Sequence, residues 1–453
     1  MNSKWHRDDS ARASSNGRLH SLAAAAAGNV LEWYDWACYS VFALILAPQF
    51  FPDSAPTTAL LATLAIFAVG FFFRPVGGVL LGAYADRHGR APALTVSVFL
   101  MAAGNLLIAG APTHATIGVF APLLLLTARV AQGLSSGGEA AAMTTYVVES
   151  APTGRRGLYA SAIHVSSTIG TLAATVLALV LHNALGSAEL ADWGWRIPFG
   201  IGAIAGLYVL YLRWRLRETP VFEQARTHPA TVSRVGALRE SRGSMLRVAG
   251  ITAGLTVSFY TFSAYLPAFA QHAHGMSANH AWFASLCAQL VFVAAVPLLG
   301  MVSDRFGPRK LLLVFGIGSA LLAPVALEFL ESSELALLAA MVMMLLLYGC
   351  GAVAMPVVVT AMFPTAVRST GIGVPYALIV AAAGGSAPYL IEYLSEHHAV
   401  HVYTGYVALL CLITAASAGL GRFRSAGMAD GSAGRGDRLQ AAQVPQDELE
   451  NLR

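Results

Sequence analysis

Charged residues are scarce in this sequence. Asp, Glu, Lys and Arg make up 11% of its 453 residues, whereas 56% are hydrophobic and the mean hydropathy is +0.61. A water-soluble chain of this length would form two or three domains, and so little charge cannot cover their surfaces. The composition therefore excludes an ordinary soluble protein and indicates a chain that lies largely in a membrane.

Cysteine and the motifs of catalysis are also scarce. The chain has four cysteines, all in apolar runs, and their spacing matches neither a disulfide framework nor a thiol metal site. The sequence contains no nucleotide-binding loop and no catalytic triad. His272, His274 and His280 lack acidic or cysteine neighbours at the spacing of metal ligands. We therefore expect no enzyme activity, no cofactor and no metal.

Long apolar runs are what the sequence has in abundance. Each contains about 20 residues, enough to cross roughly 30 Å of hydrocarbon as a helix. The first has no convincing cleavage site before Glu32 and Asp35, so we expect a retained helix and not a signal peptide. The predicted fold is an all-α membrane protein with twelve transmembrane helices, at 21–47, 58–83, 91–111, 116–137, 157–182, 195–216, 245–270, 280–301, 310–330, 334–357, 370–395 and 401–421.

Lys and Arg are missing from every second loop. All but three of the 28 Lys and Arg residues fall in, or at the helix ends beside, the segments on one side of the predicted membrane. The exceptions, Arg74, Arg129 and Arg196, lie inside predicted helices. Basic residues favour the cytoplasmic side. This distribution predicts cytoplasmic termini and an even number of helices, and it explains the net charge of +4 without nucleic acid.

Two charged loops repeat at a nearly constant spacing. GAYADRHGR at 82–90 follows the second predicted helix, and GMVSDRFGPR at 300–309 follows the eighth, 218 residues later. PTGRRG at 152–157 and PTAVR at 364–368 are 212 residues apart. Such repetition predicts two pseudo-symmetric six-helix bundles. We expect a cytoplasmic segment at 1–20, bundles at 21–216 and 245–421, a linker at 217–244 and a tail at 422–453.

These strings resemble the major facilitator superfamily and, within it, the metabolite–proton symporter family. The resemblance runs from about residue 22 to 421 and is carried by GNVLEWYD at 28–35, RPVGG at 74–78, RVAQG at 129–133, GGE at 137–139 and WGWRIPF at 193–199. Residues 258–265 and 384–389 are similar to those of α-ketoglutarate permeases. The resemblance implies a monomeric symporter of the bacterial plasma membrane, which imports protons with a small organic acid by alternating access. The favoured acid is a dicarboxylate such as α-ketoglutarate.

Other functions compete with this interpretation. They are a proton-coupled carrier of citrate, a shikimate-like acid or a zwitterionic osmolyte, an exporter, and a sensor built on a carrier scaffold. The deep Arg74 and Arg129 argue against an exporter of cationic drugs, and the short linker and tail argue against a sensor. Osmosensing carriers add a long coiled coil, which Pro445 would interrupt here.

Two carboxyl groups are expected near the middle of the first helix. Asp35 lies about 20 Å along that helix at 1.5 Å per residue, and Arg129 of the fourth helix reaches a similar depth. Burial favours the neutral form of a carboxyl group, whereas a nearby guanidinium favours the charged form. A contact between them that breaks when substrate takes Arg129 would be a proton switch, and the alternative is a permanent ion pair. Glu32, one turn away, is a second proton site or an orienting partner.

The predicted substrate site centres on Arg74, about 18 Å from the cytoplasmic loop. Its guanidinium can hold a carboxylate by two hydrogen bonds, or can brace its helix against Glu32 or a backbone carbonyl. Arg74 and Arg129 together would match the two charges of a dicarboxylate. Polar side chains of the second half are further candidate contacts, although buried tyrosines more often serve packing; they are Tyr260, Tyr265, Gln289 and Tyr376.

Charged residues near the predicted cytoplasmic end form the candidate inner gate, which the resemblance implies is shut when the carrier opens outward. They are Asp86, Arg87, Arg90, Glu139, Glu149, Asp304 and Arg305. The acidic residue usual before Phe-Pro in the second half is Ala361 here, which predicts a weaker gate in that half. His164 stands beside Ile163, where α-ketoglutarate carriers have Gln, and either titrates or is simply hydrogen-bonded.

Overall fold

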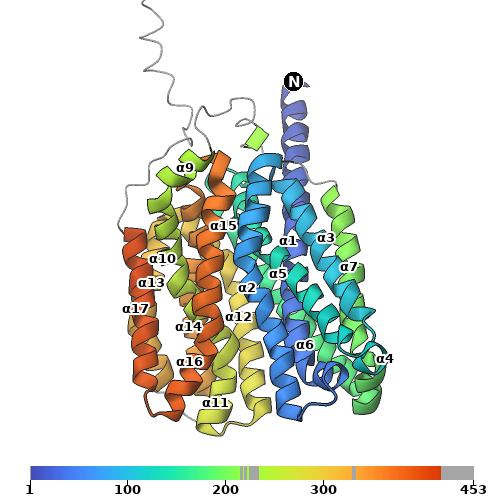
Figure 1. Ribbon diagram of the computed structural model, residues 1–453. Helices are drawn as coiled ribbons and strands as arrows, with labels where there is room; N and C mark the ends of the chain where they lie inside the picture. Colours follow the sequence, from blue (N-terminus) through green and yellow to red (C-terminus); the bar gives the residue numbers. More distant parts are fainter. Residues whose placement is uncertain (1, 215–217, 219–221, 224–233, 329–332, 420–453) are drawn as a thin grey trace, which may run out of the picture.

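The computed structural model describes residues 2–214, 218, 222–223, 234–328 and 333–419, which form one bundle of long, roughly parallel helices (Figure 1). The predicted tail at 422–453 and half of the predicted linker at 217–244 lie outside these residues. The part of the linker that is described includes α9 (Arg234–Glu240), at the end of the bundle where the N-terminus lies.

Six long helices form the N-terminal half, on the right of Figure 1. They are α1 (Asn2–Phe50), α2 (Pro56–His88), α3 (Arg90–Ala109), α5 (Phe120–Ser150), α6 (Arg156–Glu189) and α7 (Arg196–Trp214). A short helix, α4 (His114–Ile117), precedes α5, and a π-helical turn, η1 (Leu190–Gly194), precedes α7. The half has its own hydrophobic core, in which Phe42, Leu46 and Phe199 are buried.

The C-terminal half contains the other six spans, two of them built from several pieces. The continuous ones are α12 (Ala278–Phe306), α13 (Pro308–Glu328), α14 (Glu334–Thr360) and α17 (Val400–Gly419). The composite ones are α10 (Arg242–Ser258) with η2 (Phe259–Tyr265) and α11 (Leu266–His274), and α15 (Arg368–Ile379) with η4 (Val380–Gly384) and α16 (Gly385–Glu396). A 3₁₀ turn, η3 (Thr365–Val367), precedes α15, and a second hydrophobic core fills this half.

The twelve-helix prediction is confirmed, although several boundaries differ. Ten of the spans also meet a criterion of length and hydropathy for membrane crossing within the described residues; α1 and α5 complete the set. The fourth helix, α5, ends at Ser150 and not near residue 137. Arg129 and Gln132 lower the hydropathy of α5, and Gly137 and Gly138 follow them, so apolar character alone marks its end too early.

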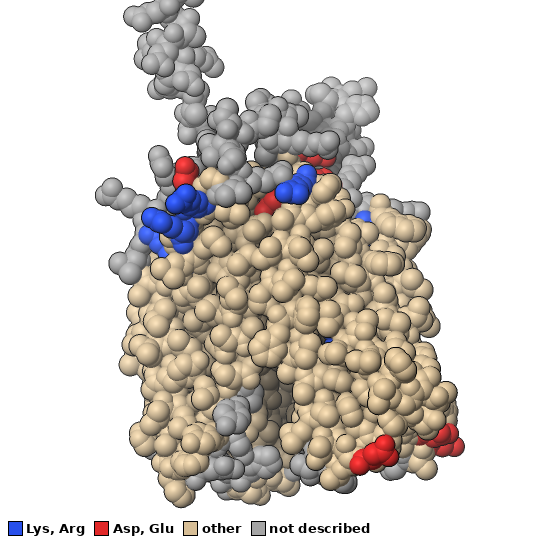
Figure 2. Space-filling model, viewed as in Figure 1, with Lys and Arg blue, Asp and Glu red and all other residues tan. Residues whose placement is uncertain are grey.

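One end of the bundle carries most of the described basic side chains. Helix α1 begins there and α17 ends there, and Lys and Arg side chains gather in the upper part of Figure 2. Arg87 and Arg305 lie in the last turns of α2 and α12, and Arg155 lies in the loop before α6. We call this end the basic end and the opposite one the far end. The chain turns back tightly at this end after α2 and α12, at Gly89 and Gly307, whose φ angles are 114° and 94°. Glycine adopts positive φ without a steric penalty, which explains why both repeats carry it.

Glycines also allow α2 and α5 to touch along their backbones. A Cβ atom at Gly137 would lie 1.9 Å from the carbonyl oxygen of Arg74, and one at Gly133 would lie 2.3 Å from that of Gly70. No side chain fits into such contacts, and small residues are the usual means of close helix packing in membranes. The contact fixes Arg74 relative to α5 and to the carboxyl groups of α1.

Candidate functional site

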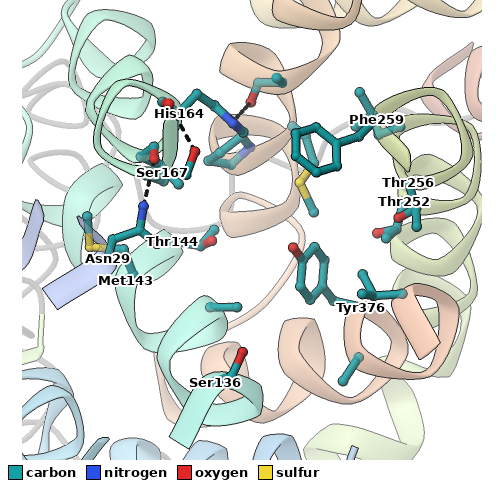
Figure 3. A pocket seen from close by; sticks show the side chains of 18 of the residues that line it. Asn29, Ser136, Met143, Thr144, His164, Ser167, Thr252, Thr256, Phe259 and Tyr376 are labelled. Carbon is teal, nitrogen blue, oxygen red and sulfur yellow. Dashed lines mark hydrogen bonds between the residues drawn. The ribbon is translucent and has the colours of Figure 1, made fainter. Parts of the chain in front are cut away.

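A cavity of about 110 Å³ lies between the two halves. Asn29, Thr144 and His164 of the N-terminal half border one side in Figure 3, and Phe259 and Tyr376 of the C-terminal half border the other. The π-helical turn η2 supplies Phe259 and Tyr260. Such turns are frequent at functional sites.

A second cavity continues from the first toward the far end. The two share Trp33, Arg74 and Tyr260, and the second adds Trp36 and Phe67. Trp36 follows Trp33 along α1, which starts at the basic end, and Phe67 precedes Arg74 along α2, which ends there. Figure 2 shows a hollow at the boundary of the halves in the lower part of the molecule. The cavity is therefore approached from the far end.

Arg74 brings a buried positive charge to both cavities. Its side chain lies against the rings of Trp36 and Phe71, with the guanidinium carbon 4.3 and 4.5 Å from the ring centres. The residue is 7% exposed, its Nε atom has no hydrogen-bond partner, and no carboxylate of the described chain lies within 4.0 Å of it. Stacking holds the group in place but does not neutralise its charge.

Glu32 lines the same cavity from α1. Its Oε1 atom accepts a hydrogen bond from the hydroxyl of Ser136, and the residue is 5% exposed. Arg74 and Glu139 are the charged residues of neighbouring helices that act most strongly on it. Arg74 and Glu32 therefore act on each other electrostatically, but they do not form the direct ion pair of the predicted brace.

Asp35 and Arg129 are in contact, as expected from their matching depths. Nη1 of Arg129 lies 3.2 Å from Oδ2 of Asp35, and Nε2 of Gln132 donates to Oδ1 at 2.7 Å. The guanidinium also lies 3.8 Å from the ring centre of Tyr39. Both charged residues are fully buried, and neither lines the described cavities. Arg129 therefore does not contact the cavity in this conformation.

The other predicted binding residues divide into two groups. Tyr260 and Tyr376 line the central cavity, and Gln289 lines the second cavity, where its amide donates to Ser285 at 3.2 Å. Tyr265, at the end of η2, lines neither cavity and packs against the hydrophobic core of its own half. The pattern did not reveal Tyr348, which faces the central cavity from α14.

His164 joins the two halves beside the cavity. Its Nε2 atom lies 3.1 Å from the carbonyl oxygen of Ala352 in α14, and its ring meets that of Tyr348 edge-on. A carbonyl oxygen can only accept, so the Nε2 atom carries a proton. The expectation of a hydrogen-bonded histidine is met. Arg196, at the start of α7, stacks on Trp195 away from the cavity.

Contacts around Asp86 connect the halves at the basic end, and we call them the first gate after their predicted role. This carboxylate accepts hydrogen bonds from the backbone N–H groups of Ser369 and Thr370, at 3.1 and 2.9 Å, and from the Thr370 hydroxyl at 2.7 Å. Arg90 lies 3.3 Å from Asp86 and donates to the carbonyl oxygen of Thr365 at 2.7 Å. The carboxylate of Asp86 thus lies at the N-terminus of α15, where backbone N–H groups and the helix dipole favour negative charge.

Glu149 extends this gate. It lies 3.7 Å from Arg90 and accepts a hydrogen bond from Nη1 of Arg368 at 2.6 Å. Negative and positive side chains therefore alternate along the gate, and they come from both halves. Arg368 looked like an ordinary basic loop residue, but it is buried at the start of α15.

A second set of contacts, which we call the second gate, repeats the backbone hydrogen bonds of the first. Asp304 of α12 accepts from the backbone N–H groups of Gly157 and Leu158 at the start of α6, at 2.6 and 2.9 Å. Asp304 follows Asp86 by 218 residues, and its two donors precede those of Asp86 by 212. The repeat spacing of 218 residues therefore relates the two acceptors of this symmetric pair of contacts, and the spacing of 212 residues relates their donors.

Three predicted gate residues lie elsewhere. Glu139 pairs with Arg213 of α7 at 2.6 Å and accepts from Ser97, inside the N-terminal half, so its predicted place beside Asp86 is wrong. Ten residues of helix separate it from Glu149, about 15 Å along α5. Arg213, counted in the sequence among the basic residues at helix ends, is therefore part of a buried ion pair. Arg87 and Arg305 are exposed.

Comparison with known proteins accounts for this architecture. Residues 21–244 match the family model for sugar (and other) transporters, and residues 249–437 match that of the Major Facilitator Superfamily. The chain is 37% identical over 401 residues to the alpha-ketoglutarate permease of Escherichia coli (strain K12), covering 87% of this chain and 92% of the permease. The chain belongs to the major facilitator superfamily. Its resemblance to the proton symporters of that superfamily is confirmed.

Further relatives and solved structures agree. The citrate-proton symporter of Klebsiella pneumoniae is 32% identical (87% and 90% coverage), and the proline/betaine transporter of Escherichia coli (strain K12) is 31% identical (88% and 83%). The proton:xylose symporter XylE bound to 6-bromo-6-deoxy-D-glucose has a TM-score of 0.72 at 18% identity (89% and 95%). The human organic anion transporter MFSD10 has a TM-score of 0.66 at 16% identity (88% and 99%). At such identities these structures support the shared superfamily fold of a multi-pass membrane protein.

Proposed function

We propose that this protein imports a small organic acid together with protons by alternating access. The observation that carries the proposal is Arg74, a buried guanidinium without an ion-pair partner among the described residues, in a cavity between the halves. An uncompensated charge at this depth is costly unless an anion binds it. A carboxylate suits the planar donor fork of arginine.

The relatives support a carboxylate as the common element. Alpha-ketoglutarate, citrate, proline and betaine, the solutes in the relatives' names, all carry one. Among these we favour a dicarboxylate of α-ketoglutarate size, which rests on the 37% identity to that permease. Arg129 is paired with Asp35 outside the cavity, so of the two deep arginines only Arg74 lines the cavity in this conformation.

A zwitterionic solute is the second candidate. Glu32 lines the same cavity as Arg74, and a solute with one ammonium and one carboxylate group would match both charges. The 31% identity to a proline/betaine transporter adds to this candidate.

The orientation follows from charge. The basic end is taken as cytoplasmic because Lys and Arg favour that side. With the basic end shut by two gates and the hollow at the far end, the conformation corresponds to an outward-facing carrier. Each chain holds its cavity between its own two halves, so we take the monomer as the transport unit.

Uptake into proteoliposomes tests the proposal. Labelled α-ketoglutarate, citrate, succinate, proline and glucose are offered with and without an inward proton gradient. We expect gradient-driven accumulation of a carboxylate, and Arg74→Lys should raise its KM at least tenfold because a point charge cannot replace the bidentate fork. Preference for glucose, indifference to the gradient, or normal transport by Arg74→Lys would contradict it.

A further inference from the structure

Two carboxyl groups lie one turn apart on α1, and their surroundings differ. Both oxygens of Asp35 are engaged, one by Arg129 and one by Gln132, and the residue is fully buried outside the cavities. The ring of Tyr39 lies against Arg129. A proton or a substrate carboxylate entering the cavity meets neither member of this pair.

Glu32 is placed differently. It lines the central cavity, and its described hydrogen bond is the one that Oε1 accepts from Ser136. The charged groups acting on it are Arg74 of α2, Glu139 of α5 and Asp35 of α1. Tyr260 and Tyr376 face it from the other half, within the same electrostatic neighbourhood. Of these groups, Arg74 is the positive one.

Charge balance links Glu32 to the solute. With Glu32 ionised and Arg74 charged, the empty cavity is neutral, because Asp35 and Glu139 are already paired with Arg129 and Arg213. A bound carboxylate adds one negative charge, whose burial is unfavourable until a cation or proton compensates it. A proton on Glu32 restores neutrality and leaves Arg74 to the solute.

We propose that Glu32, and not Asp35, is the carboxyl group that gains a proton when substrate binds, one proton for each carboxylate bound at Arg74. The proton enters through the cavity and forms an O–H bond on Glu32, and the solute carboxylate takes Arg74. On the opposite side the solute leaves, Arg74 again compensates Glu32, and the proton is released. The Asp35–Arg129 pair holds α1 against α5. This inference rests on the proposed function, since it requires carboxylate binding.

Proton uptake on binding tests the proposal directly. Purified full-length protein in weakly buffered detergent is mixed with α-ketoglutarate, or with whichever carboxylate the wild type transports, while a pH-sensitive dye reports bulk protons. We expect about one proton per carboxylate bound by the wild type and by Asp35→Asn, and none by Glu32→Gln, which should still exchange solute across vesicles. Proton uptake by Glu32→Gln equal to wild type, or its loss only in Asp35→Asn, would overturn the inference.

A second variant covers the case in which Glu32→Gln does not fold. Ser136→Ala removes the hydroxyl that stabilises ionised Glu32, so the pH midpoint of coupled uptake should move to higher pH. Ser135→Ala is the matched control, because Ser135 donates to the Ser97 carbonyl and does not line the cavity. An equal shift in both variants, or no shift in Ser136→Ala, would contradict the proposal. Failure of the wild type to couple any carboxylate to protons would refute the proposed function instead.

Discussion

The two gates at the basic end share a contact but not its reinforcement. Asp86 and Asp304 each accept two backbone N–H groups from the first turn of a helix in the opposite half. Around Asp86, however, Arg90, Glu149 and Arg368 add a chain of ion pairs. At the symmetric positions of the second gate, Arg90 becomes Pro308 and Glu149 becomes Ala361.

Opening the basic end must break the hydrogen bonds that both aspartates accept from the opposite half. The ion pairs around Asp86 change only how much free energy this opening requires. A carboxylate on a helix N-terminus is the shared element, and it can act only while the halves are in contact. The ion pairs are an addition to one side. We therefore expect the first gate to contribute most of the free energy that keeps this end shut.

Removing each carboxylate should have the largest effect and should break the apparent symmetry. Asp86→Asn loses an ion pair and charge-assisted hydrogen bonds, which we expect to cost the closed state about 3 kcal/mol, against about 1.5 kcal/mol for Asp304→Asn. Labelling of a cysteine introduced at the basic end, in a background without native cysteines, should rise more for Asp86→Asn. Equal labelling would show that the ion pairs add nothing.

Cutting the ion-pair chain alone should have a smaller effect. Arg368→Gln keeps Asp86 on its helix but removes the partner of Glu149, and we expect a loss of about 2 kcal/mol in the closed state. Arg155→Gln is the control, since it removes an exposed arginine next to the symmetric position. The same labelling assay compares them, and an equal or larger rise for Arg155→Gln would contradict the ranking.

Adding at the second gate the acid that only the first gate has should strengthen the second gate. Ala361→Glu puts a carboxylate near the start of α6 and should stabilise the closed basic end by about 0.5–1 kcal/mol. Exchange of solute across vesicles should slow by a few-fold, because the closed state must open in each cycle. Ala361→Gln controls for side-chain size, and faster exchange in the Glu variant would refute the interpretation.

The smallest effects are expected at the two arginines that follow the gate aspartates. Arg87 and Arg305 are exposed, so Arg87→Ala and Arg305→Ala should each change the closed state by less than about 0.5 kcal/mol. Labelling near wild-type levels in both variants, with normal membrane insertion, would agree. A tenfold rise in either one would return these residues to the gate.

Much of the fold could be predicted because membrane spans and internal repeats leave strong signals. Apolar runs reveal helices, and the repeat spacings anticipate the paired contacts of Asp86 and Asp304. The contact between Asp35 and Arg129 could be predicted from their matching depths, since charged side chains near the middle of the bilayer must compensate each other.

The directions of individual side chains were harder to predict. They depend on how each helix is rotated about its axis and on whether residues at a helix end are buried. Tyr260 and Tyr265 both lie in the π-helical turn η2, which no composition signal marks, so their different directions were not predictable. Arg213 begins a basic run and Arg368 stands alone after a short loop, so both read as topology signals, although each is buried in an ion pair.

Another property follows from the glycines where the halves meet at the basic end. A Cβ atom at Gly157 would lie 2.6 Å from the carbonyl oxygen of Gly300, and one at Gly82 would lie 3.2 Å from the Cα of Thr370. At these two positions the helix backbones of the halves therefore meet directly, with no side chain between them. A single methyl group would act as a wedge: Gly157→Ala should bias the protein toward the open basic end and supply a conformationally trapped form for raising state-specific antibodies or inhibitors.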